Sequence, residues 1–221
     1  MPILQFGPKA ILCCLPMAAL AGFATASEAV EEWRFSVLLD GKPIGTHEFV
    51  LKSGEEGGRT LRSEARFDVK ILGLTAYRYR HQAEERWQGD CLVSIASRTD
   101  DDGSKTAVTS EASAGGITVT AVGGKQPSAA AIEGCVMSFA YWNPQLAKQN
   151  RLLDPGTGRL ESVTISALPA RSIEAKGKPV AVTGVRIAGL ARPIDVWYAG
   201  EEWVGLDTEV RGGRKLTYRQ P

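Results

Sequence analysis

The strictest constraint in this sequence is a stretch, residues 61–87, in which apolar and charged side chains alternate around a central Gly73. Side chains that point to opposite sides at each step are typical of an antiparallel β-sheet with one covered and one solvated face. The covered face carries Leu61, Ser63, Ala65, Phe67, Val69 and Ile71, and then Tyr77, Tyr79, His81, Ala83, Glu85 and Trp87. We therefore predict two paired strands joined near the glycine.

The charged face indicates how these two strands pair. A turn centred near Gly73 places Asp68 opposite Arg78 and Arg62 opposite Glu84. Opposite charges in facing positions stabilise a strand pair by well under about 1 kcal/mol each. We predict this register, with Phe67 on the covered face.

Shorter alternating runs continue to the C-terminus, separated by turn dipeptides such as Asp40-Gly41 and Asp102-Gly103. This pattern predicts a mainly β fold, a single curved antiparallel meander sheet that is half-barrel or barrel-like. The expected strands span residues 33–39, 44–51, 61–71, 77–87, 91–98, 105–110, 117–122, 160–167, 180–190, 193–198, 203–210 and 215–218.

Two segments interrupt this series of strands. The low-complexity stretch 123–131 is rich in small residues, and we interpret it as a loop. Asn143-Pro144 has the residues of a helix N-cap and first helical position, so we predict one short helix from there to about Leu152.

The N-terminus has the features of a cleavable secretory signal. Lys9 precedes an apolar stretch over residues 10–23, and Ala24-Thr25-Ala26 supplies the small residues that a signal peptidase accepts. The apolar stretch is shorter than the roughly 20 residues of a membrane-spanning helix. We interpret it as a signal peptide and not as a membrane anchor.

We therefore expect cleavage between Ala26 and Ser27, a periplasmic mature chain, and no transmembrane segment in it. Residues 1–26 would be removed, and residues 27–221 would form a single β-rich domain. Loss of Lys9 takes the formal net charge from +1 to 0. A neutral chain has no long-range field for phosphates, so we expect no nucleic-acid partner.

Two cysteines follow the signal, Cys91 and Cys135. Outside the cytoplasm, two thiols in one chain usually form a disulfide, which we predict here; two separate buried thiols are the alternative. His47 and His81 are the only histidines, and no Cys-x-x-Cys or His-x-x-x-His spacing occurs. We expect no metal site and no cofactor.

His81 shares its predicted strand face with Tyr77, Tyr79, Glu85 and Trp87. One interpretation is that these groups hold the polar head of a ligand or move a proton. The other is that amphipathic side chains satisfy one another at the rim of a core.

The densest aromatic cluster is Ser-Phe-Ala-Tyr-Trp-Asn-Pro over residues 138–144. Its aromatic residues either face a ligand or anchor the short helix against the sheet. No catalytic residue is assigned, because the sequence contains no nucleophile elbow. The candidate ligand-binding residues are Tyr77, Tyr79, His81, Trp87, Tyr141 and Trp142.

Three segments carry a resemblance to a known family. They are W-x-F-x-V-x-L-D-G-x-x-I-G over residues 33–45, F-A-Y-W-N-P over 139–144 and L-L-D-x-x-T-G over 152–158. They resemble a secreted proteobacterial protein family of unknown function, which implies no activity and no catalytic residues. The strand-rich layout is also similar, at the level of fold alone, to periplasmic half-barrel carriers of lipids or lipoproteins.

Three functions remain open. The first is a non-enzymatic binding or carrier protein for an apolar or amphipathic ligand such as a lipid, because a sheet with one wet face can curve around it. The second is a structural or protein-interaction module of the envelope that binds another protein by a sheet edge. The third is a hydrolase or isomerase that uses His81 with Glu85 or a tyrosine. An open, aromatic-lined cavity of roughly several hundred Å³ favours the first.

Overall fold

The computed structural model describes residues 29–124 and 128–221. The predicted signal peptide and its cleavage site after Ala26 lie outside the described residues. The strands are β1 (Val30–Leu39), β2 (Lys42–Ser53), β3 (Gly58–Ile71), β4 (Leu74–Gln88), β5 (Cys91–Asp101), β6 (Ser104–Ser113), β7 (Gly116–Gly123), β8 (Ser128–Glu133), β9 (Arg151–Leu153), β10 (Leu160–Ser162), β11 (Thr164–Ala175), β12 (Lys178–Ala188), β13 (Ile194–Ala199), β14 (Glu202–Val210) and β15 (Arg214–Arg219). Two 3-10 turns accompany them, η1 (Glu55–Gly57) and η2 (Pro144–Lys148).

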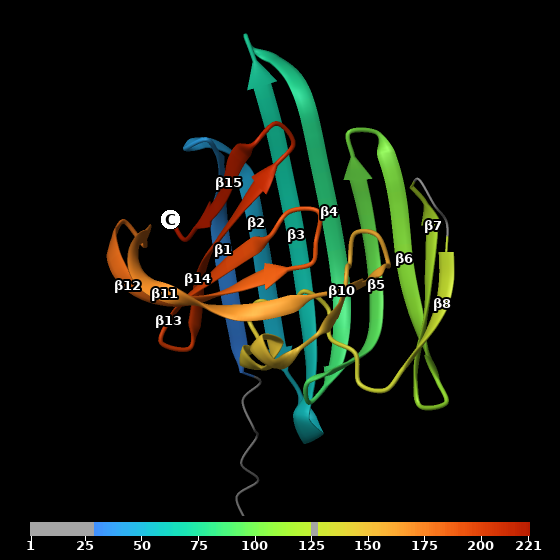
Figure 1. The fold of residues 1–221 in the computed structure, drawn as a ribbon. Coiled ribbons are helices and arrows are strands. Elements are labelled where there is room, and N and C mark those ends of the chain that lie inside the picture. The colour runs from blue at the N-terminus through green and yellow to red at the C-terminus, as the bar shows by residue number, and fades with distance from the viewer. Residues whose placement is uncertain (1–28, 125–127) are drawn as a thin grey trace, which may run out of the picture.

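Thirteen strands form one antiparallel sheet in the order β11-β12-β13-β14-β15-β1-β2-β3-β4-β5-β6-β7-β8, while β9 and β10 pair separately. The chain is therefore a meander in two runs, joined where β15 pairs with β1 and places Leu216 opposite Leu39. Figure 1 shows the sheet strongly curled, and in this order its two ends, β11 and β8, remain edges. The predicted curved antiparallel meander is confirmed.

The hairpin of β3 and β4 has the predicted register. Asp68 lies opposite Arg78, and Arg62 lies opposite Glu84. Arg62 Nη2 is 2.9 Å from a Glu84 carboxylate oxygen on the exposed outer face. Phe67 is buried on the inner face. The period-two pattern therefore specified both the faces and the pairing.

Local irregularities let the sheet curl. Register shifts interrupt five ladders, those of β1–β2, β3–β4, β4–β5, β11–β12 and β13–β14. Such bulges bend a strand and increase its twist. At Gly45 a Cβ atom would lie 1.8 Å from the carbonyl oxygen of Arg66, so only glycine allows this close approach of β2 and β3. Across the inner face of the sheet, Trp203 of β14 contacts Phe35 and Phe49, with ring centroids 4.4 and 5.0 Å apart.

Residues 134–163, which we call the covering segment, run across the inner face of the sheet from β8 to β11 (Figure 1). Met137, Ala140 and Leu146 of this segment are buried in the main core. The predicted disulfide joins Cys91 of β5 to Cys135 at the start of the segment. Next to it, the amide of Leu92 donates to the carbonyl of Val136 at 2.8 Å. The covering segment is thus tied to the sheet covalently and by hydrogen bonds.

The expected loop over residues 123–131 is wrong in its second half, because β8 occupies Ser128–Glu133. Ile132 is the one buried residue of this strand. An edge strand that buries so little has no apolar alternation by which a sequence pattern would reveal it.

The short helix predicted from Pro144 to about Leu152 is the five-residue 3-10 turn η2. The Asn143 side chain caps it as predicted, accepting from the amide of Gln145 at 2.9 Å. Leu152 lies instead in β9, where pairing with β10 buries it completely. No helix among the described residues is long and apolar enough to cross a lipid bilayer.

Strand β14 is buried on both faces, since Trp203 and Leu206 belong to the inner side and Val204 belongs to a second, smaller core. The second core contains Ile173, Ala175, Val182 and Trp197 from β11, β12 and β13. The hairpin of β11 and β12 therefore folds over the outer side of β13 and β14 and gives this part of the sheet a second layer.

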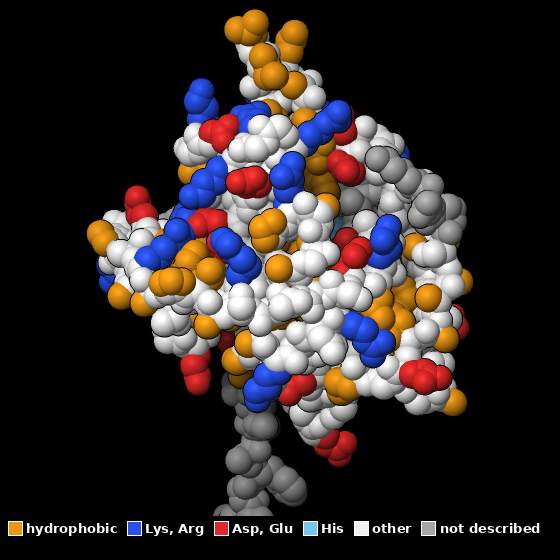
Figure 2. Space-filling model, in the orientation of Figure 1, with side chains coloured by type: hydrophobic (Ala, Val, Ile, Leu, Met, Phe, Trp, Pro, Cys, Tyr) orange, Lys and Arg blue, Asp and Glu red, His pale blue; other side chains and the backbone are white. Residues whose placement is uncertain are grey.

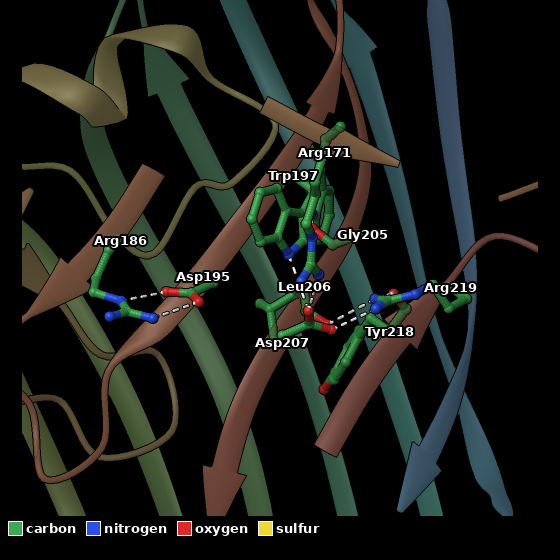
Figure 3. Close-up of polar contacts among 10 residues, drawn as sticks. Arg171, Arg186, Asp195, Trp197, Gly205, Leu206, Asp207, Tyr218 and Arg219 are labelled. Atoms are coloured by element: carbon green, nitrogen blue, oxygen red, sulfur yellow. Dashed lines mark hydrogen bonds and ion pairs between the residues drawn. The ribbon is translucent and has the colours of Figure 1, made fainter. Parts of the chain in front are cut away.

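Asp207 is the polar centre of that second layer (Figure 3). Its carboxylate accepts hydrogen bonds from Trp197 Nε1 at 3.1 Å and Arg219 Nη2 at 2.6 Å, and it pairs with Arg171. The Arg171 guanidinium also stacks on the Trp197 ring, 3.8 Å from its centroid. A buried carboxylate with this many partners is satisfied, so we interpret the cluster as a structural link between β11 and β14.

Replacing both Cys91 and Cys135 with serine should lower the free energy of unfolding by about 3–4 kcal/mol, because the bond closes a long loop in the unfolded chain. The two cysteines are 44 residues apart. Urea denaturation of the unreduced protein and of the double variant measures the difference. Reaction of both thiols with a maleimide in the unreduced, denatured protein would contradict the crosslink.

Candidate functional site

An open cavity of about 820 Å³ lies between the covering segment and the inner face of the sheet. Three parts of the chain line it: β2 to β4, the covering segment, and the strands β13 to β15, which we call the returning strands, with the connection between β12 and β13. Its volume is typical of small-molecule sites, which are lined mainly by apolar side chains. The apolar wall includes Phe49, Leu61, Phe139, Leu190, Leu206 and Leu216.

His47 lines this cavity and carries a buried polar atom without a partner. Its Nδ1 lies 3.4 Å from the Tyr218 hydroxyl, whereas its buried Nε2 has no hydrogen-bond partner among the described residues. Burial, and then the nearby His81, lower the pKa of His47 well below its usual value, so the ring is neutral at neutral pH. Nε2 itself is closed off from the cavity, so a polar group of a ligand reaches it only when the ring turns.

Glu85 is a second buried polar group in the lining. It is 3% exposed, and its Oε2 accepts from Trp87 Nε1 at 3.1 Å and from the Ser138 hydroxyl at 3.0 Å. No cation of the described chain pairs with it. Burial raises the pKa of Glu85 from 4.5 to about 7, while the two hydrogen bonds act in the opposite direction. The group therefore titrates near neutral pH.

Charged side chains belong to the more exposed part of the lining. Arg159 Nε lies 3.1 Å from Glu161, and both residues line the cavity. Arg192, which also lines it, lies 3.8 Å from Glu209. The two arginine side chains are 66% and 53% exposed. The cavity thus combines an apolar interior with a charged, wet margin.

The predicted ligand-binding residues separate in the structure. Tyr79 and Tyr141 line the cavity. Trp87 and Trp142 instead pack edge-on against each other in the core, with ring centroids 5.4 Å apart. Trp142 also carries the Arg59 guanidinium over its ring at 4.6 Å. The aromatic run of the covering segment therefore both anchors that segment and contributes to the cavity.

The remaining two predicted residues, both on β4, are absent from the cavity lining. His81 is buried, and its Nδ1 lies 2.9 Å from the Thr99 hydroxyl. The Tyr77 hydroxyl donates to Asp101 at 2.5 Å, near the exposed end of the hairpin. Within the described chain, no hydrogen bond joins His81 to Glu85, and no group of three or more His, Cys, Asp or Glu side chains is placed to hold a metal ion.

Sequence reasoning missed the part of the site that depends on distant pairing. Neither His47 nor Tyr218 is among the residues that the sequence predicts to bind a ligand. The pairing of β15 with β1 and of β1 with β2 brings these two side chains together across 171 positions of sequence. The alternation of His47 with Phe49 shows only that they share a face, so no local signal could have joined them to Tyr218.

Comparisons with known proteins support the fold and leave the chemistry open. A family model described as Domain of unknown function (DUF6134) matches residues 35–220. No curated protein matches this chain. A solved structure described as a beta-barrel-like protein of domain of unknown function DUF1849 from Brucella abortus is 12% identical, with a TM-score of 0.55 over 85% of this chain and 94% of that chain. That likeness is one of fold.

Glu85 should make the stability of the protein fall as the pH rises. The folded chain keeps a proton up to about pH 7, whereas the unfolded chain releases it near pH 4.5. This stabilisation is full below the lower value and is lost through the upper one, and it is on the order of 3 kcal/mol. The lowered pKa of His47 acts in the opposite direction below pH 6.5, so the effect must be read as a difference between variants.

We predict that Glu85→Gln gains about 2.5 kcal/mol relative to the wild type between pH 5 and pH 8, because the amide never charges. Urea unfolding at the two pH values measures this double difference. Glu84→Gln, on the exposed face beside it, is the control and should show no change of this size. An equal difference between Glu85→Gln and wild type at both pH values would contradict the assignment.

Proposed function

The chain belongs to the family described as Domain of unknown function (DUF6134), and from its geometry we propose that it is a non-enzymatic binding or carrier protein for an apolar or amphipathic ligand. The observation that carries the proposal is the open cavity of about 820 Å³ between the covering segment and the sheet. Aliphatic and aromatic walls of this size give an acyl chain or a similar apolar body a place out of water.

The polar groups favour an amphipathic ligand over a purely apolar one. His47 Nε2 is buried without a partner, which costs free energy, and a turn of the ring into the cavity would let a ligand hydroxyl or amide satisfy it. The exposed Arg159 and Arg192 at the margin leave room for a head group that stays in water. The ligand would enter with its apolar part first.

We further propose that the protein works in the periplasm, after cleavage between Ala26 and Ser27. The proposal rests on the signal-like residues 1–26. The bond between Cys91 and Cys135 supports it, because structural disulfides persist in oxidising compartments.

A second candidate function is supported by the open end of the sheet at β8. The residues Ser128 to Ala131 of this strand are small and exposed, and the strand contains no proline or lysine that would block pairing at its free edge. Such an edge suits an envelope protein that adds a strand. The hydrolase or isomerase hypothesis gains no support, since His81 bonds Thr99 and not Glu85.

The carrier proposal is tested on protein purified from its own source. Native mass spectrometry and organic extraction should reveal a bound apolar molecule, and the emptied protein should bind N-phenyl-1-naphthylamine. Ser63→Trp places a large ring in the cavity and should weaken probe binding by roughly tenfold or more. Arg62→Trp adds the same ring on the opposite, exposed face and should leave binding unchanged.

Unfolding curves of both variants show whether each is folded. A folded wild type that carries no extractable molecule and binds no probe would contradict the carrier proposal. Equal loss of probe binding in Ser63→Trp and Arg62→Trp would place the probe outside the cavity and contradict it as well.

A further inference from the structure

The hairpin of β3 and β4 projects beyond the rest of the sheet. Pairing of β3 with β2 ends where Phe67 meets Gly45, and pairing of β4 with β5 ends where Tyr79 meets Asp101. Beyond these points the two strands pair only with each other, out to the turn at residues 72–73. Figure 1 shows this end standing clear of the neighbouring strands.

The projecting end is apolar. Ile71 is 59% exposed, Leu72 98% and Leu74 76%. The other large exposed apolar side chains among the described residues, Val30, Val93 and Val122, lie on three separate strands. Figure 2 shows the hydrophobic side chains gathered at the protruding tip. Scattered exposed apolar residues are ordinary, whereas a contiguous group on a protrusion marks a contact surface.

Leu72 is also unfavourable for the turn itself. Leu72 and Gly73 have φ angles of 51° and 82°, the left-handed pair of a type I′ turn, in which asparagine or aspartate is favoured first. Three other two-residue turns with positive φ at both positions have a charged residue at the first position: Asp40-Gly41, Asp102-Gly103 and Lys176-Gly177. This turn alone among them pairs a strained backbone with a fully exposed apolar side chain, which points to a contact made outside the chain.

We propose that this apolar tip, Ile71, Leu72 and Leu74, inserts into the surface of a lipid bilayer. Three side chains at the end of a two-stranded ribbon fall far short of the roughly 800 Å² per partner that a specific protein interface buries. A bilayer needs no complementary shape, and apolar side chains enter it in proportion to the area that they remove from water.

The residues just below the tip fit the head-group level of a bilayer. Lys70 directly precedes the tip on β3, and it lines a groove at the hairpin base with Lys42, Asp68 and Arg214, of which Arg214 pairs with Asp40 at 2.7 Å. Lys70, as the basic residue next to the tip, would lie where it attracts anionic head groups. Tyr77, with its hydroxyl bound to Asp101, is amphipathic and suits the same interface.

The proposal is tested by flotation of the full chain with vesicles of phosphatidylethanolamine and phosphatidylglycerol. Leu72→Asn keeps the turn, since Asn-Gly is favoured there, and should lower the vesicle partition coefficient severalfold. Ile71→Thr and Leu74→Thr added to it should bring the loss to roughly tenfold or more. Val122→Asn removes an apolar side chain that is 63% exposed away from the tip and should leave partitioning unchanged.

A Leu72→Trp variant reports on the tip itself, because its emission should shift to shorter wavelength when vesicles are added. No vesicle binding by the wild type, or binding that the triple variant retains, would overturn the proposal. Self-association that Leu72→Asn abolishes, without vesicle binding, would assign the tip to a second copy of the chain and also overturn it.

This inference stands apart from the carrier proposal, because none of the three tip residues lines the cavity. Leu72→Asn should therefore bind N-phenyl-1-naphthylamine as the wild type does, and Ser63→Trp should float with vesicles as the wild type does. Failure of one proposal leaves the other measurable.

Discussion

The structure depends on how one curled sheet keeps its apolar inner face from water. A single layer of strands cannot bury that face alone. Here the covering segment supplies Met137, Ala140 and Leu146, and the returning strands supply Trp203, which meets Phe35 and Phe49. The disulfide at Cys135 fixes where the covering segment begins. The segment fills the space only in part, and the cavity is the part that it leaves open.

The return of the chain over itself requires a strand with two buried faces. Strand β14 packs Trp203 inward and Val204 outward, and Asp207 joins it to Arg171 and Arg219. This polar link lies on the side away from the cavity. These interactions hold the curl of the strands β11 to β15, while the cavity lining keeps polar atoms, such as His47 Nε2, that the fold does not satisfy.

The sequence was most informative where pattern and charge act locally. Alternation and opposite charges specified the pairing of Asp68 with Arg78, and two cysteines after a predicted secretory signal were enough to predict the bond between Cys91 and Cys135. Strand β8 could not be predicted because it buries little. The cavity could not be predicted because it depends on pairing between β15 and β1. Alternation placed Tyr79 on the inner face, where it lines the cavity. The same alternation placed Trp87 there too, so it could not separate cavity residues from core residues.

The central claim is that the inner face encloses a cavity that accepts an apolar chain from solution. A crystal structure grown with 11-bromo-1-undecanol measures this directly, because anomalous scattering locates the bromine atom. The account predicts a bromine peak inside the cavity, near Phe49, Leu190 and Leu206, with the hydroxyl within hydrogen-bond distance of a polar lining atom. A covering segment packed solidly against the sheet, with bromine only on the outer surface, would contradict it.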